Sequence, residues 1–203
     1  MRFRYHTKIN HTKHLTDARF AAAAGIHYLG FCFDNTSASF IPPIKAKEII
    51  DWTSGSHIVG EFGNQSAEDI NTIVQLLNID IVELNEPLAD NGINAIHVPV
   101  ILAIDVEKMS ESSFLEFCTN YQNQVQAFHL FNWESLAQTQ PEVFSKIGIE
   151  FILHLKGHLM NQLSVLTQIN PFGVSFDSDS EEKAGMKDFE DLSDFIAQIA
   201  LQD

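Results

Sequence analysis

Cysteines, basic residues and long apolar runs are all scarce in this chain of 203 residues. The two cysteines, Cys32 and Cys118, are too few for a disulfide framework. No stretch approaches the roughly 18 apolar residues of a membrane span, and the first residues contain no apolar signal segment. These absences argue against a membrane partner, and we expect a cytoplasmic protein.

Positive charge is scarce because 12 Lys and Arg residues stand against 27 Asp and Glu residues, which gives a net charge of −15. Such an acidic chain repels phosphate backbones, so we expect no nucleic-acid partner. Hydrophobic residues make up 45% of the chain, enough for a sizeable core. No linker or low-complexity tract divides the sequence, and residues 1–203 are expected to form one domain.

Short apolar runs rich in Val, Ile and Phe alternate with helical stretches, which indicates βαβ units and a parallel sheet. The expected strands are Phe3–Ile9, Tyr28–Phe33, His57–Phe62, Asp80–Leu84, Val100–Ile104, Gln126–Leu130, Phe151–Leu155 and Val174–Phe176. The expected helices are Leu15–Ala24 with Gly25 as its cap, Pro43–Thr53, a helix that Ser66 caps, Ser110–Tyr121, Glu142–Ile147, Met160–Ile169 and Asp188–Leu201. The segment Glu86–Ile96 has little periodicity and predicts a vestigial fourth helix.

Periodicity does not distinguish a closed barrel from an open sheet, but particular segments do. The residues Lys8-Ile9-Asn10-His11 and later Gly30-Phe31-Cys32-Phe33 resemble the first two strands of phosphoribosylanthranilate isomerases, which read Lys-Ile-Cys-Gly and Gly-Phe-x-Phe. Val59-Gly60-Glu61-Phe62 resembles the third strand of that family, and residues 174–188 resemble its closing phosphate loop. The resemblance covers the whole chain. It implies the α/β class and a (β/α)8 TIM barrel, with any site at the carboxyl ends of the strands.

The resemblance also implies a chemistry, the Amadori rearrangement of an aminoribosyl phosphate. In the family a cysteine on the first strand is the general base and an aspartate on the sixth strand is the general acid. Asn10 occupies the cysteine's position, and its amide cannot take up a proton near neutral pH. The sixth strand offers no carboxylate at the expected place. His129 is a weak candidate for a substitute acid or base, although a histidine on a strand is more often simply packed and hydrogen-bonded.

Other positions that the resemblance places at the ligand site also depart from the family pattern. They are Ser39, Glu83, Asn85 and Leu102, with Lys156, Gly157, Asp177, Ser178 and Asp179 in the phosphate cradle. Asp177 and Asp179 would repel a phosphate dianion, and Lys156 either offsets that charge or pairs with one carboxylate. Alternation of side chains predicts that Asn10, Leu102, His129 and Lys156 all point toward the barrel axis.

Three functions remain open from the residues. The first is a barrel of this family that is inactive as the isomerase or binds a different small ligand. The second is an active isomerase of tryptophan biosynthesis in which His129, Glu83 or His11 transfers the protons. The third is a protein-interaction role for the acidic surface. No cofactor is expected. No metal site is expected either, because Lys156-Gly157 makes a loop between His154 and His158.

Overall fold

Eight parallel strands pair in the order β1 to β8 and back to β1, so the sheet closes into a barrel. This is a computed structural model, which describes residues 3–89, 92–178 and 190–200. The strands are β1 (His6–Asn10), β2 (Tyr28–Cys32), β3 (His57–Phe62), β4 (Ile81–Leu84), β5 (Val100–Asp105), β6 (Ala127–Phe131), β7 (Glu150–His154) and β8 (Gly173–Asp177). The predicted (β/α)8 barrel is confirmed.

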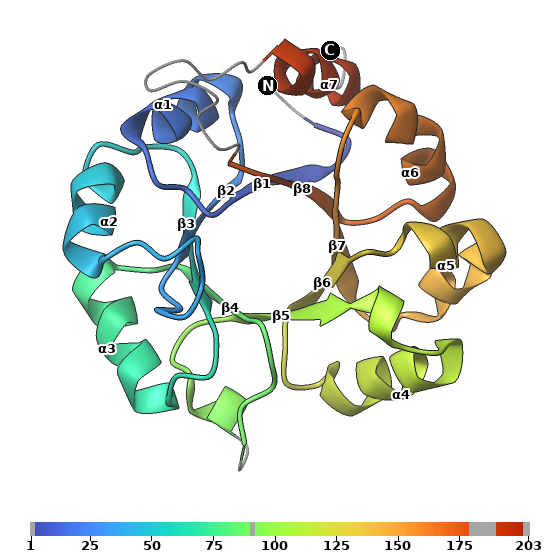
Figure 1. Ribbon diagram of the computed structural model, residues 1–203, viewed down its shortest axis with the longest axis horizontal. Helices are drawn as coiled ribbons and strands as arrows, with labels where there is room; N and C mark the ends of the chain where they lie inside the picture. Colours follow the sequence, from blue (N-terminus) through green and yellow to red (C-terminus); the bar gives the residue numbers. More distant parts are fainter. Residues whose placement is uncertain (1–2, 90–91, 179–189, 201–203) are drawn as a thin grey trace.

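Figure 1 looks along the barrel, with the helices in a ring outside the strands. They are α1 (Leu15–Ala24), α2 (Pro43–Ile50), α3 (Ala67–Leu77), α4 (Glu111–Tyr121), α5 (Glu134–Thr139), α6 (Leu163–Ile169) and α7 (Glu190–Ile199). Gly25 ends α1 at a φ of 73°, a left-handed conformation that glycine adopts without strain. The Ser66 side chain accepts a hydrogen bond from the Asp69 backbone N–H and so caps α3. Among the described residues, no helix is long and apolar enough to cross a membrane.

The connection between β6 and β7 differs from the prediction. The sequence predicts a helix at Glu142–Ile147, whereas the structure has α5 before it and a 3-10 turn at Pro141–Lys146. Pro141 has no backbone N–H, so it cannot continue α5 and the chain starts a new, tighter turn. The vestigial fourth helix is confirmed as a 3-10 turn at Gly92–Ala95.

Side chains of each strand alternate between the barrel interior and the helices. At the amino ends of the strands the interior holds an apolar cluster, which we call the floor: Tyr28, Val59, Ile81, Ile101, Ala127 and Ile152. The other inward positions, nearer the carboxyl ends, are polar on most strands. We call that end of the barrel the mouth. The larger apolar core lies between the sheet and the helices.

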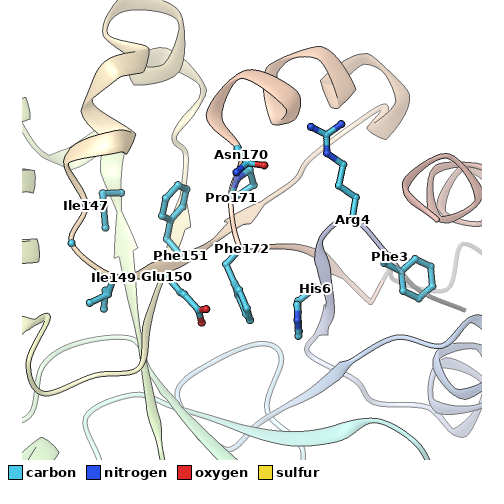
Figure 2. A pocket seen from close by; sticks show the side chains of 11 residues that line it. Phe3, Arg4, His6, Ile147, Ile149, Glu150, Phe151, Asn170, Pro171 and Phe172 are labelled. Atoms are coloured by element: carbon cyan, nitrogen blue, oxygen red, sulfur yellow. The ribbon is translucent and has the colours of Figure 1, made fainter. Parts of the chain in front are cut away.

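Three histidines gather at the amino ends of β1, β2 and β3. The ring of His6 lies 4.2 Å from that of Phe172 and 4.5 Å from that of His27, measured between centroids. Figure 2 shows His6 and Phe172 side by side on the wall of an open hollow, with Arg4 pointing away from them. The hollow has a volume of about 730 Å³. The imidazole of His6 is already stacked on neighbouring rings of the protein. Enzymes of this fold bind their ligands at the opposite end of the barrel.

Acid is expected to destabilise the protein through His27. Burial, with smaller contributions from His6 and His57, lowers the pKa of this histidine to about 4. The Thr7 backbone N–H also donates to His27 Nδ1, which favours the neutral ring. Between pH 6.5 and 4 the unfolded chain therefore binds more protons, so the free energy of unfolding falls as pH falls. For a half-exposed ring we expect a contribution of about 1 kcal/mol, measured by urea unfolding from pH 7.5 to 4.5. His27→Gln should show a shallower decline, and an equal decline in both proteins would contradict this assignment.

Candidate functional site

A connected set of polar side chains fills the upper interior of the barrel. Six strands contribute, and the residues are Lys8 and Asn10 (β1), Glu61 (β3), Glu83 (β4), His129 (β6), His154 (β7), and Ser175 and Asp177 (β8). All but Asp177 are buried. Each lies an even number of residues from another inward position of its strand, so the alternation of the strands brings them to one place.

Lys8 lies at the centre of this network, although its side chain is fully buried. Its Nζ atom lies 2.6 Å from Glu61 Oε1 and 3.2 Å from Glu83 Oε2, and it donates a third hydrogen bond to Asn10 Oδ1. Burial alone would lower the pKa of Lys8, but the two carboxylates raise it above its ordinary value. Gly30 makes room for this arrangement, because a Cβ atom there would overlap the Glu61 carboxylate.

Asn10 faces the barrel axis, as its register predicts, and both ends of its amide are engaged. Its Oδ1 accepts the hydrogen bond from Lys8. Its Nδ2 lies 3.2 Å from His154 Nδ1 and 3.3 Å from Asp177 Oδ1. The side chain is thus held by partners from β1, β7 and β8. An amide in this setting can orient its neighbours, but it cannot act as a general base.

His129 also faces the interior, where both of its ring nitrogens have partners. Nδ1 lies 2.9 Å from Glu83 Oε1, and Nε2 lies 2.6 Å from Ser175 Oγ. Burial lowers the pKa of His129. Burial opposes ionisation of Glu83, yet His129 and Lys8 together hold its pKa below the ordinary range. The more common outcome for a strand histidine, packed and hydrogen-bonded, is what the structure contains at His129.

Asp177 ends β8 and lies between two imidazoles. His11 Nδ1 is 3.4 Å from Asp177 Oδ1, and His154 Nε2 is 3.5 Å from Asp177 Oδ2. Burial would raise the pKa of Asp177, but the hydrogen bonds to His11 and His154 lower it well below the usual range. The next residue, Ser178, donates a hydrogen bond to Asp17. An ionised carboxylate therefore stands in the predicted phosphate cradle.

Leu102 was expected at the mouth, and this prediction is wrong. The residue is fully buried in the core between sheet and helices, and its pairing partners Leu84 and Phe128 face the same way. On β5 the inward side chains belong instead to Ile101, which is part of the floor, and to Ala103, which lies nearer the mouth and pairs with His129. A slip of one residue in the assumed register moves a side chain to the other face of a sheet.

Four of the remaining predicted residues lie in loops. Lys156 is exposed, and its Nζ donates to Asn132 Oδ1 at 2.6 Å rather than reaching into the barrel toward Asp177. Gly157 follows it with a φ of 68°. Asn85 is exposed after β4, and Ser39 is half-buried in the loop after β2. Asp179 lies outside the described residues.

The sequence patterns did not indicate Lys8, Glu61 or Ser175 as site residues. The sequence did contain a signal for Lys8, because a charged residue inside an otherwise apolar strand lies either at an exposed edge or in an interior polar site. Lys8 and Asn10 are two residues apart, which places them on one face of β1. Within the described ranges, no three His, Cys, Asp or Glu side chains are arranged to hold a metal ion. The Lys8 ammonium lies between the two interior glutamates instead.

Fold and site together define a (β/α)8 barrel with a polar interior at the carboxyl ends of its strands, the end at which enzymes of this fold carry their active sites. The model of the N-(5'-phosphoribosyl)anthranilate (PRA) isomerase family matches residues 7–198. The chain belongs to that family.

Curated relatives and solved structures agree with this assignment. An N-(5'-phosphoribosyl)anthranilate isomerase of Chlorobium chlorochromatii is 30% identical over 196 residues, which cover 90% of each chain. One of Chlorobium phaeobacteroides is 27% identical over 200 residues, covering 91% of this chain and 93% of the relative. The crystal structure of phosphoribosyl anthranilate isomerase from Thermotoga maritima superposes with a TM-score of 0.78 at 21% identity, covering 96% of this chain and 98% of the other. That structural likeness concerns the fold.

Proposed function

We propose that this barrel is inactive as phosphoribosylanthranilate isomerase and that its mouth binds a different small ligand. The supporting observation is the state of Asn10, at the position where the family resemblance expects the general base. Its amide has no basic atom, and hydrogen bonds to Lys8 and to the β7 and β8 side chains hold it in place. The inward residues of β6, where the general acid is expected, are Ala127, His129 and Phe131.

The rival function is an active isomerase with substitute residues, and one observation favours it. His11 is an imidazole that is partly open to solvent at the mouth, with 35% of its side chain exposed. His129 and Glu83, the other proposed substitutes, are buried and already paired with each other. The names of the curated relatives also support this rival.

Genetic rescue distinguishes the two functions without any assumption about which residues substitute. A bacterial strain that lacks phosphoribosylanthranilate isomerase needs tryptophan for growth. We expect this chain, expressed in that strain, to leave the requirement in place. Growth without tryptophan would support the rival. A family isomerase expressed from the same vector is the positive control, and immunodetection of both proteins confirms comparable levels.

Sugar phosphates are expected to bind weakly because Asp177 is ionised in the predicted cradle. A dianion placed near this carboxylate meets like charge, while the Lys156 ammonium is bonded to Asn132 rather than to Asp177. We expect ribose 5-phosphate to bind with a Kd of about 1 mM or weaker, by calorimetric titration. Asp177→Ser, alone or with Asp179→Gly, should tighten binding, more at low salt than at moderate salt. Micromolar binding by the unaltered protein would remove this argument against a phosphorylated ligand.

A further inference from the structure

His11 adopts a backbone conformation that is uncommon for residues other than glycine. Its φ is +57°, in the left-handed region. Three other described non-glycine residues have positive φ, and all are asparagines: Asn78, Asn132 and Asn170. Asparagine and histidine both enter this region more readily than most residues with a side chain. What distinguishes His11 is the set of contacts that its imidazole makes.

The imidazole of His11 connects two strands that are not neighbours in the barrel. Nδ1 lies 3.4 Å from Asp177 Oδ1 on β8, and Nε2 lies 3.5 Å from Glu61 Oε2 on β3. The His11 backbone N–H donates to the same Glu61 oxygen at 3.2 Å. The ring thus lies at the mouth, just beyond the end of β1, between Glu61 on β3 and Asp177 on β8. The side chain of Asn10, the residue that precedes His11, is buried, and the residue is 1% exposed.

We propose that His11 is a latch that closes the mouth of the barrel by bridging Glu61 and Asp177, and that the proton on its ring holds the latch closed. With both ring nitrogens protonated, the imidazolium donates to one carboxylate on each side. A neutral ring has one N–H, so it can donate to one carboxylate only. A latch is compatible with an active or an inactive barrel, so this proposal and the proposed function can fail separately.

The charged groups around the ring set the direction of the pH dependence. Burial lowers the pKa of His11, but Asp177 and Glu61 raise it above its ordinary value in spite of the opposing charge of Lys8. His154, on β7, faces the other oxygen of Asp177. The latch is therefore closed below the raised pKa of His11 and weakens as the pH rises through it. Protonation of Asp177 in strong acid removes the other half of the bridge.

Cys32 is a native reporter for this latch. It is buried, lies on the inward face of β2, and pairs in register with Glu61, the β3 anchor of His11. Cys118 is buried on α4, outside the barrel, and serves as an internal reference. The rate at which 4,4′-dithiodipyridine modifies each cysteine is measured by mass spectrometry for the unaltered protein and for His11→Asn. Asparagine tolerates the same backbone conformation and removes the titrating ring.

We expect Cys32 of His11→Asn to react about tenfold faster than in the unaltered protein near pH 6.5, with Cys118 unchanged. The ratio of the two Cys32 rates should fall between pH 6.5 and pH 9, because the unaltered latch loses its proton as the pH passes the raised pKa of His11. Equal rates at both pH values would overturn the latch, and a ratio that does not change with pH would overturn the role of the proton. If Cys118 also accelerates, the variant has loosened as a whole. The histidine ring resonances of the unaltered protein then decide, since a His11 pKa at or below 6.5 would contradict the proposal.

Discussion

Purified protein is expected to show no measurable conversion of phosphoribosylanthranilate. Loss of a general acid or a general base each lowers a rate on the order of 10²–10⁴-fold, and Asn10 supplies no base at the place where the family resemblance expects one. The fluorescence of the substrate gives a continuous assay, with a family isomerase as the positive control. Turnover within about a hundredfold of that control would show that substitute groups exist.

Asn10→Cys alone is expected to leave the protein inactive. The new thiol would restore the expected base, but the inward side chains of β6 would still be Ala127, His129 and Phe131. The substitution also removes the acceptor that Asn10 offers to Lys8 and the donor that it offers to Asp177. Recovery of activity by this single change would show that an acid is present elsewhere in the mouth.

Lys8→Met is expected to cause the largest loss of stability of any single substitution in the interior. It leaves Glu61 and Glu83 buried without the ammonium that neutralises them, and breaking a buried ion pair costs about 3–5 kcal/mol. Urea unfolding at pH 7 measures the change. The loss should shrink as the pH falls toward 5, because the uncompensated glutamates then have pKa values above those of the unfolded chain.

The matched control replaces all three charges, as Lys8→Met with Glu61→Gln and Glu83→Gln. This protein should regain most of the lost free energy of unfolding, since no buried charge remains. A triple variant no more stable than Lys8→Met would mean that packing around the lysine stem, not charge, is what the single substitution removes. A loss below about 1 kcal/mol for the single variant would contradict the central place of Lys8 in the network.

Most strands and helices were predictable because they depend on local patterns, whereas the closed barrel was implied by the family resemblance. Each strand is a short run rich in β-branched residues, and strands alternate with helices along the chain. Gly25 and Ser66 mark helix ends, because glycine adopts a left-handed conformation and serine caps a helix N-terminus. The unpredicted helix α5 shows the limit, since six residues without a strong apolar stripe give little periodicity. After Pro141 the chain forms a 3-10 turn in place of the expected helix.

The candidate site was predictable only in part, because its contacts join residues far apart in sequence. Asn10, Glu83 and His129 were chosen, and the structure brings them into one network. The prediction for Leu102 was wrong because a shift of one residue along a strand moves a side chain to the other face of the sheet. Lys8 was read as part of a motif, and its partner Glu61 lies 53 residues further along the chain. No local pattern reports such a pairing.

The apolar floor at the amino ends of the strands has a consequence for exchange with water. Tyr28, Val59, Ile81, Ile101, Ala127 and Ile152 separate the polar interior from the lower end of the barrel. Apart from the Tyr28 hydroxyl, which is hydrogen-bonded to His6, the side chains of this layer are hydrocarbon, so we expect protons of the Lys8 ammonium and the His129 ring to reach solvent mainly through the mouth. The polar interior thus exchanges protons with solvent at one end of the barrel. Its protons equilibrate at a rate set by how often the mouth is uncovered.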